Sequence, residues 1–389
     1  MSAWPFFRYF FNYILGAKTR QKLLFIAVSG LFLSSFSLIF IQGIMGGLQK
    51  SLVNRSKGVN GSHVIRFQEL TSEDLTNLKD LLRKKAILFY SELEVEVMLK
   101  GKNFVSPSRL HGIDLSDERP TFLEDRDFKG LVMGSDLANK MNLKFFDEVQ
   151  IISPSVTDSL LGEVPRFVSE TLVDYVYSEV SEVDEFESWI RIGLVQNLLR
   201  QRGINQIRLF GEVSSSDLND IKKFRTEVPF EVVSWEKMNG ALVWSLNLET
   251  KVMLFLFISM SLLVAIAITS GLLIFFSKIR KDLMSFWILG MSQPKLLQLC
   301  LRFILGLAGF ICLIGCITGS IALRVLESYG HDIMPDIFVE RTFPVELSAS
   351  SIVTSFLIPF GISMIFSFFS FGQFRKENQS FVDIVRSIS

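Results

Sequence analysis

The stretch that decides the fold is residues 23–48, LLFIAVSGLFLSSFSLIFIQGIMGGL, which contains no charged side chain. Three more charge-free stretches follow, at Val252–Phe276, Phe303–Leu323 and Leu347–Phe374. A bilayer core about 30 Å thick is spanned by roughly 20 apolar residues of helix. Lipid cannot satisfy free backbone groups, so each stretch must be helical. The sequence therefore predicts four transmembrane helices.

The composition supports a membrane protein and excludes some other classes. Of 389 residues 49% are hydrophobic, 37 are Phe, and the mean hydropathy is +0.37. The charges balance, at 40 Lys and Arg against 40 Asp and Glu, and no domain is strongly basic, so nucleic-acid binding has no support. Cys300, Cys312 and Cys316 all fall in or beside one hydrophobic stretch, which implies no disulfide framework in the polar region.

The first stretch could in principle be a cleaved signal peptide. Its apolar run is about twice the usual length of such a region, and no small-residue cleavage site follows it. Gly46-Gly47 leads directly into Leu48-Gln49-Lys50, which continues the helical pattern. We therefore expect an uncleaved anchor.

The distribution of Lys and Arg in short loops predicts the orientation. Arg8, Lys18, Arg20 and Lys22 precede the first span, and Arg375 and Lys376 follow the fourth. Between spans two and three stand Lys278, Arg280, Lys281 and Lys295 against Asp282, whereas five acids and Arg341 lie between spans three and four. Both termini are thus expected in the cytoplasm, with the large domain, from about residue 50 to 250, on the outer side of the membrane.

These signals divide the chain into nine parts. In order they are a cytoplasmic or interfacial segment 1–22, span one 23–48, a periplasmic domain 49–251, span two 252–276, a cytoplasmic segment 277–295, span three 296–324, a periplasmic loop 325–346, span four 347–374 and a cytoplasmic tail 375–389. The aromatic run Trp4–Tyr13 suits a helix in the headgroup layer, or alternatively an aromatic belt on span one.

The periplasmic domain is expected to be α+β. Strands are predicted at 63–67, 149–152, 168–177 and 205–210, and helices at 72–85, 135–142 and 216–226. Residues 92–100 alternate Glu or Lys with apolar side chains, which is typical of a half-buried strand, and the turn Lys100–Asn103 leads into a second strand, 104–113.

Several kinds of chemistry have no signature. There is no P-loop and no nucleophile elbow, and His63, His111 and His331 are scattered, so no zinc constellation can be drawn. The acidic run Glu179–Glu187 lacks calcium-loop spacing and is interpreted as a solvated face. Deep within the spans there is no Asp, Glu, Lys or Arg, which argues against an ion-coupled transporter. We expect a chain that is not an enzyme by itself.

Motifs along the whole chain resemble the lipoprotein-releasing ABC permeases, the LolC and LolE family, within a group that also includes MacB and FtsX. The order of one span, a large outer domain and three spans is that of the group. The motifs are Gly130–Gly134 with Leu137-Ala138, Leu143, Asp147, Val149 and Ser153-Pro154; Trp235, Asn239, Leu242, Leu246 and Glu249; Lys281-Asp282 with Leu289–Ser292; Phe343–Ser348; and, more loosely, Phe381–Arg386.

The resemblance implies a function and partners. In that family two permease subunits sit on a dimer of a separate ABC ATPase, which holds ATP and Mg. Together they extract acylated lipoproteins from the inner membrane and pass them to a periplasmic carrier. No cofactor is expected on this chain. Four helices are too few to enclose a pathway, so a second permease subunit, identical or paralogous, is expected.

The resemblance also implies three sites. The ATPase-coupling segment is Lys281, Asp282, Leu283, Phe286, Trp287, Leu289, Gly290 and Ser292, a short amphipathic helix that could alternatively lie on lipid. The carrier-binding loop is Ser153–Arg166, with Pro154, Gly162, Pro165 and Arg166, or else an ordinary surface loop. The lipoprotein cavity is bordered by Phe36, Phe40, Ile44 and Met45, a stripe that helix packing or lipid contact would explain equally.

Two other functions stay open at this point. A MacB-like export permease usually carries its ATPase on the same chain, and none is present here. An FtsX-like signalling subunit, which controls a cell-wall hydrolase, typically has an outer domain smaller than the roughly 200 residues expected here.

Overall fold

The computed structural model describes residues 22–68, 70–124, 126, 128–159, 162–178, 180–224, 228–288, 292–330 and 344–377. The predictions for the N-terminal segment, for most of the loop before span four and for the tail beyond Glu377 lie outside these residues. The chain divides into two compact units, one of residues 1–50 with 245–389 and one of residues 51–244.

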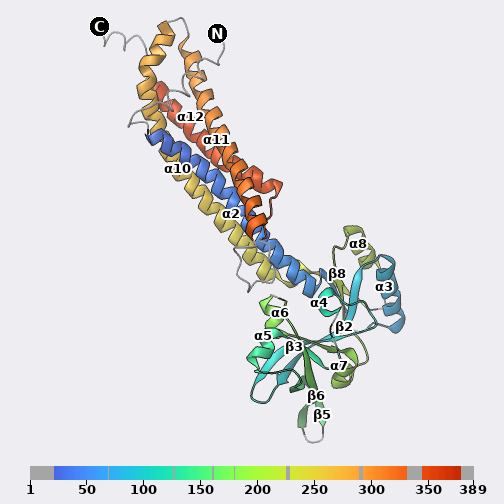
Figure 1. The fold of residues 1–389 in the computed structure, drawn as a ribbon. Helices are drawn as coiled ribbons and strands as arrows, with labels where there is room; N and C mark the ends of the chain where they lie inside the picture. Colours follow the sequence, from blue (N-terminus) through green and yellow to red (C-terminus); the bar gives the residue numbers. More distant parts are fainter. Residues whose placement is uncertain are drawn as a thin grey trace. The chain divides into compact units, whose positions relative to one another are not determined.

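Four long helices make up the described part of the first unit (Figure 1). They are α2 (Lys22–Asn60), α10 (Gly240–Ile288), α11 (Gln293–Tyr329) and α12 (Ala349–Glu377), and α2 and α10 continue into the second unit. Each contains a segment long and apolar enough to cross a membrane: Val28–Asn60, Gly240–Ile266, Gln298–Tyr329 and Ala349–Gly372. The four predicted membrane helices are therefore present.

Helix α2 contacts the other three through small and polar side chains. Ser34 Oγ is 2.9 Å from Ser261 Oγ on α10, and Gln42 Oε1 accepts a hydrogen bond of 3.1 Å from Thr354 Oγ1 on α12. Toward α11 the contact is closer, because Gly315 and Gly319 bring that helix against the backbone of α2. Small residues four apart let helices approach closely in lipid, where no hydrophobic force drives their association.

The second unit contains the strands and the shorter helices. The strands are β1 (His63–Arg66), β2 (Leu88–Lys100), β3 (Val105–Ile113), β4 (Leu131–Gly134), β5 (Glu148–Ser159), β6 (Gly162–Val176), β7 (Glu187–Arg191), β8 (Gln206–Phe210) and β9 (Glu231–Ser234). The helices are α3 (Ser72–Lys84), α4 (Thr121–Glu124), α5 (Ser135–Lys140), α6 (Ser181–Phe186), α7 (Ile192–Leu199), α8 (Ser215–Lys223) and α9 (Trp235–Met238). All follow the first membrane helix and precede the second in the chain.

The strands form one sheet that closes on itself over part of its width. The strand order is β3-β7-β4-β6-β5-β2-β8-β1-β9, and β3 also pairs with β2. That extra pairing joins β2, β3, β7, β4, β6 and β5 into a ring, from which β8, β1 and β9 extend. Strand β2 belongs to both parts, because Leu88–Glu92 pair with β8 and Glu92–Lys100 pair with β3.

Each part of the sheet has its own core. Leu93, Val97 and Leu99 of β2 are buried with the apolar side chains of α5 and α7. Leu78 of α3 and Ile221 of α8 are buried against the extension, beside Ile65 and Ile207. Leu93, Val97 and Leu99 are thus inside, as the alternation predicts, whereas Val95 is only partly buried and Met98 is exposed.

Most predicted elements are confirmed, and three expectations need correction. Helix 72–85 is α3, whose cap Thr71 accepts a hydrogen bond from Asp74 N at 3.4 Å, and the predicted hairpin is β2–β3. The predicted strands 149–152 and 168–177 are longer, because the residues between them continue both strands. The short helix expected at 281–292 is not separate, because α10 continues as helix to Ile288.

The third correction concerns the acidic run Glu179–Glu187, which is not simply a solvated face. Asp184 and Glu187 are each 2% exposed. Ser178 donates hydrogen bonds of 2.8 Å to Asp184 from both its N–H and its hydroxyl, and His111 and Arg109 contact Glu187. His111 and Arg109 are distant from the run in sequence, and Ser178 contacts Asp184 within a local turn. The composition of the run therefore does not reveal these partners.

The close contact between α2 and α11 yields a stability prediction. A Cβ at Gly315 would lie 2.8 Å from the carbonyl oxygen of Phe32, which is backbone and cannot rotate away. We expect Gly315→Ala to destabilise the helix unit by about 1–3 kcal/mol through overpacking. Gly306→Ala on the same helix is the control, since no atom lies within 4 Å of its Cβ position. Equal thermal unfolding midpoints in detergent for the two variants would contradict this packing.

Candidate functional site

The predicted cavity stripe lies on α2 and is only partly buried. The rings of Phe36 and Phe40 stack at a centroid distance of 5.7 Å. Phe40 and Ile44 pack against a buried cluster that includes Cys316 of α11. Helix packing thus explains Phe40 and Ile44 within the chain, while Phe36 and Met45 keep part of their surface exposed. A role of the stripe in holding acyl chains stays a prediction.

The segment before span four lies along the glycine-rich part of α2. Glu346 N donates a hydrogen bond of 2.9 Å to Gly43 O, and the Glu346 carboxylate pairs with Lys50 at 2.8 Å. A Cβ at Gly47 would lie 2.1 Å from the carbonyl oxygen of Pro344. Ser348 then accepts a hydrogen bond of 3.1 Å from Ser351 N at the start of α12. The described part of the Phe343–Ser348 motif therefore packs against α2, and this packing requires glycine at position 47.

The expected ATPase-coupling residues are only partly within the described structure. Lys281, Asp282, Leu283, Phe286 and Trp287 continue α10 as helix, and Ser292 immediately precedes α11. The side chains from Lys281 to Trp287, and Leu289 and Gly290 altogether, lie outside the described residues. The coupling role stays a prediction.

The expected carrier-binding loop is the far end of the β5–β6 hairpin. Val156 pairs with Pro165, and Ser159 pairs with Gly162. Pro154 falls where the register shifts between Ile152 and Val156, and such irregularities are where a sheet tolerates proline. The prediction of a long loop is therefore wrong. Pro165 is exposed and Arg166 is half-buried, the side chains of 154–164 lie outside the described residues, and the role in carrier binding stays a prediction.

A group of buried and partly buried charges in the second unit is the feature that the sequence did not predict. It joins Glu92 and Glu94 of β2, Arg109 and His111 of β3, Glu187 of β7 and Arg208 of β8. Glu92 is 0% exposed, and Arg208 is 5% exposed. We call these six residues the charge cluster.

Hydrogen bonds connect the charge cluster throughout. Glu92 accepts from Arg208 Nε at 2.8 Å and from His111 Nδ1 at 2.8 Å. His111 Nε2 contacts the carboxylate of Glu187, which also accepts from Arg109 Nη1 at 2.7 Å. Glu94 accepts from Arg208 Nη2 at 3.0 Å. With His111 protonated, three cations face three carboxylates, so the buried charge is balanced.

The neighbouring charges control the protonation of His111 and Glu92. Burial alone would lower the pKa of His111, but the carboxylates of Glu187 and Glu92 raise it to about 10. Burial alone would raise the pKa of Glu92, but Arg208 and His111 lower it to about 2. Both groups are therefore charged at neutral pH.

Three residues of the charge cluster carry side chains that can bind metal ions. Ligand atoms of Glu92, Glu94 and His111 lie within 4.8 Å of one another. A histidine ligand must offer a ring nitrogen lone pair, and both ring nitrogens of His111 face carboxylates, which requires two N–H groups. The arrangement fits a network of ion pairs and does not fit a metal ion.

The charge cluster holds the end of a long helix against the sheet. Arg208 Nη1 donates a hydrogen bond of 2.8 Å to the carbonyl of Asn60, the last residue of α2. Two more contacts fix the same helix end, because Trp235 Nε1 donates to Ser56 Oγ at 2.9 Å and Lys57 pairs with Glu236 at 2.7 Å. The last turns of α2 are thus anchored to β8 and α9 inside the second unit.

Most of the remaining motif residues are structural. Leu137 and Ala138 are buried in the core of the strand ring. A Cβ at Gly130 or Gly134 would lie 2.4 Å from a neighbouring carbonyl oxygen. Within the first unit, Gln49 Nε2 donates to Glu249 Oε2 at 3.1 Å.

A sequence scan could have found Gly315 and Gly319, which form a Gly-x-x-x-Gly pattern in an apolar helix.

The raised pKa of His111 yields a prediction of pH dependence. Its stabilising contribution is complete below the unfolded pKa of 6.5 and is lost as the pH rises toward the folded value of about 10. We expect the unfolding midpoint of the domain, followed by tryptophan fluorescence, to fall between pH 7 and 10. The unfolding midpoint of His111→Gln should be lower at pH 7 and should no longer fall between pH 7 and 10. If this variant keeps the pH profile of the unmodified chain, the profile does not come from His111.

Comparison with known proteins finds similarity to one curated protein over most of the chain. No family model matches the sequence. The lipoprotein-releasing system transmembrane protein LolC of Buchnera aphidicola subsp. Schizaphis graminum (strain Sg) is 22% identical, and the match covers 89% of each chain. Among solved structures, the extracellular domain of the ABC-type transporter YknZ from Gram-positive bacteria aligns with a TM-score of 0.27 and 12% identity, over 44% of this chain and 100% of that one. The chain is thus similar along most of its length to a lipoprotein-releasing permease, which confirms the resemblance that its motifs indicated.

Proposed function

We propose that this chain is the permease subunit of an ATP-driven ABC transporter that extracts acylated lipoproteins from the inner membrane and passes them to a periplasmic carrier. The observation that carries the proposal is the similarity to LolC, because it covers 89% of both chains and so includes membrane helices and the domain between them. Four apolar helices with one inserted α and β domain fit that role.

In this proposal the domain of residues 49–251 is periplasmic and both termini are cytoplasmic. The support is the excess of Lys and Arg before span one, between spans two and three and after span four. ATP and Mg belong to a dimer of a separate ATPase, which docks on the segment from Lys281 to Ser292. A second permease subunit completes the pathway, and the β5–β6 hairpin receives the carrier.

The physical task explains why such a machine needs ATP. Each CH₂ that leaves the hydrocarbon costs about 0.8 kcal/mol, so the removal of whole acyl chains costs far more than spontaneous release allows. Helix α2 is the element suited to transmit movement from membrane to domain. Gly315 and Gly319 fit α11 against it in the first unit, and Arg208 and Trp235 hold its last turns in the second. ATP-driven movement of the helices then closes the cavity beside Phe36 and Met45.

The direct test of the proposal is co-purification in mild detergent from the native host. We expect an ABC ATPase and triacylated lipoproteins to elute with the tagged chain, and addition of ATP with a carrier to release the lipoproteins. A matched preparation of an unrelated four-span protein controls for lipoproteins that adhere to detergent micelles. Recovery of a cell-wall hydrolase partner without acylated cargo would contradict the proposal and favour the signalling function.

A further inference from the structure

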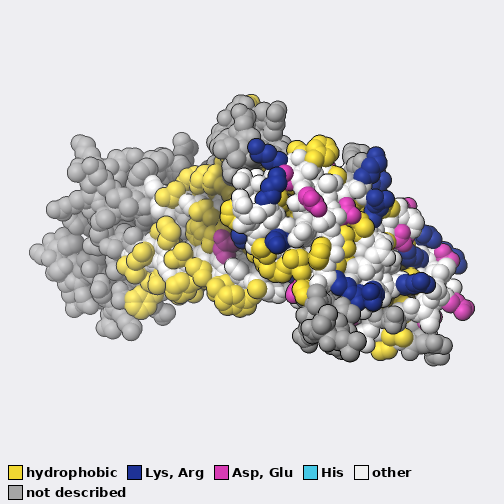
Figure 2. All heavy atoms as spheres, turned by 90° about the horizontal axis from the view of Figure 1, so that it is seen from below, with side chains coloured by type: hydrophobic (Ala, Val, Ile, Leu, Met, Phe, Trp, Pro, Cys, Tyr) yellow, Lys and Arg dark blue, Asp and Glu magenta, His cyan; other side chains and the backbone are white. Residues whose placement is uncertain are grey.

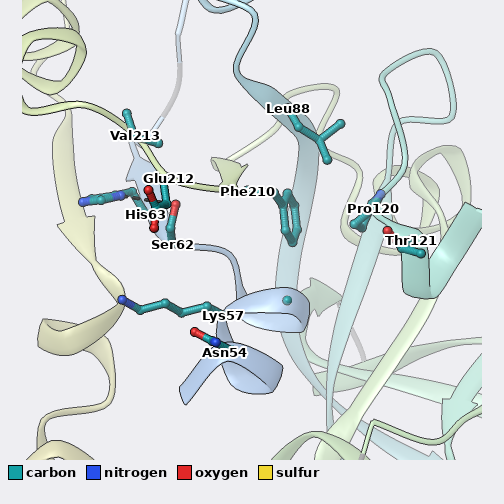
Figure 3. Close-up of a pocket in the computed structure, with 12 residues that line it drawn as sticks. Asn54, Lys57, Ser62, His63, Leu88, Pro120, Thr121, Phe210, Glu212 and Val213 are labelled. Atoms are coloured by element: carbon teal, nitrogen blue, oxygen red, sulfur yellow. Dashed lines mark hydrogen bonds between the residues drawn. The ribbon is translucent and has the colours of Figure 1, made fainter. Parts of the chain in front are cut away.

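Exposed apolar side chains of the second unit gather at two turns, residues 101–104 and 143–147. The pocket at the end of α2 does not offer such a surface (Figure 3). Phe210, one of its lining residues, is 6% exposed and packs on Tyr90 with ring centroids 5.4 Å apart. The two turns, by contrast, each present phenylalanine side chains to solvent.

Two contacts hold these turns side by side. Lys102 Nζ pairs with Asp147 Oδ1 at 2.8 Å. A Cβ at Gly101 would lie 3.1 Å from Leu143 Cδ2, so the backbone of the first turn packs directly on the second. The phenylalanines of the two turns therefore belong to one region of the surface.

The region contains Phe104, Phe145 and Phe146, which we call the aromatic surface. Phe104 is 48% exposed, Phe145 is 51% exposed and Phe146 is 78% exposed. Among the described residues no large apolar side chain is more exposed than Phe146, and this comparison includes the membrane helices. Gathered apolar side chains on a domain surface commonly mark an interaction site.

The backbone of Phe146 has a conformation that does not favour its side chain. Its φ is +68°, in the left-handed region that bulky residues rarely adopt. Phe146 N donates a hydrogen bond of 2.8 Å to Leu172 O, and Leu172 N donates one of 3.0 Å to Asp147 O, which fixes the turn on β6. Glycine would adopt this φ without strain. Folding therefore does not explain the exposed ring, and strain of this kind is typical of functional sites.

The neighbouring ring is held in place before any partner binds. Phe145 packs on Tyr175 with ring centroids 4.4 Å apart, and the Tyr175 hydroxyl donates a hydrogen bond of 3.1 Å to Leu143 O. A ring that is already fixed loses little conformational entropy when a partner covers it. Aromatic side chains of this kind are the usual anchors at the centre of protein–protein interfaces. The aromatic surface thus suits contact with another protein.

The charges beside the aromatic surface are of both signs. Lys100, Lys144 and Glu148 are exposed, and within the described part of the chain none of them makes an ion pair. A strongly acidic partner would leave Glu148 unpaired, and a strongly basic partner would be repelled by the lysines. A second copy related by a two-fold axis offers its Glu148 to Lys144 and its Lys144 to Glu148, so the surface is complementary to itself.

We propose that the aromatic surface is the place where the second unit meets the same surface on a second copy of this chain. The inference rests on the proposed function for the presence of a second permease subunit, and it adds the residues through which the two domains touch. The end of the β5–β6 hairpin stays free for a carrier, because the 12 residues of β5 separate it from Glu148 by roughly 35 Å.

The test uses the full chain in its native membranes, in two copies that carry different affinity tags. The photoreactive analogue p-benzoylphenylalanine replaces Phe104 or, as a control, Leu115, an exposed residue beyond the other end of β3. We expect ultraviolet light to produce a cross-linked product with both tags from position 104 and not from position 115. Mass spectrometry should assign the link to residues 101–104 or 143–147 of the second copy.

Two variants separate binding from folding. Phe146→Gly and Phe146→Asn remove the ring and tolerate the φ of +68°, so the thermal unfolding midpoint in detergent should not fall. Cross-linking from position 104 should fall by about fivefold or more, because aromatic anchors carry much of the binding free energy of an interface. Cross-linking that stays at the level of the unmodified Phe146 in both variants would overturn the proposal.

The remaining outcomes distinguish this proposal from the proposed function. The surface assignment is overturned if position 104 gives no product with both tags, or if it links instead to a carrier or a paralogous permease. The proposed function still stands in that case if an ABC ATPase and lipoproteins co-purify. If the product with both tags forms and no lipoprotein co-purifies, the surface assignment stands and the proposed function fails.

Discussion

The structure depends first on the close packing of α2. In lipid, helices gain little by hiding apolar surface from one another, so association requires close contact and hydrogen bonds between polar side chains. Gly315 and Gly319 of α11 supply the close contact, and Ser34 and Gln42 supply the hydrogen bonds. One helix thereby organises the other three, and a larger side chain at the glycine positions would separate them.

The same helix ends among charged residues of the second unit. Removing ions from water costs free energy. In the charge cluster this cost is offset because three cations form ion pairs with three carboxylates. Loss of one partner leaves a buried charge uncompensated, which typically costs about 3–5 kcal/mol. Figure 2 shows charged side chains of both signs scattered over one face, among hydrophobic and other side chains. An exposed ion pair such as Lys237–Glu231 contributes little by comparison.

The sequence predicts those elements whose formation depends on a few consecutive residues. Hydropathy predicts the four membrane helices, and alternation and capping predict β2 and α3, because each signal lies within a few consecutive residues. The sequence does not predict the charge cluster, because Glu92, His111 and Arg208 are distant from one another along the chain. The alternating pattern of β2 predicts that Glu92 is exposed, whereas it is buried. The sequence predicts a loop in place of the ends of β5 and β6 because proline is unfavourable within a sheet. The strand register shows how Pro154 and Pro165 are accommodated.

Depletion of this chain in its native host tests whether it releases lipoproteins from the inner membrane, as we propose. After the chain is depleted, newly made outer-membrane lipoproteins are followed by pulse labelling and separation of inner from outer membranes. We expect them to accumulate in the inner membrane while outer-membrane β-barrel proteins, which carry no acyl anchor, are sorted normally. Normal lipoprotein sorting after complete depletion would contradict it.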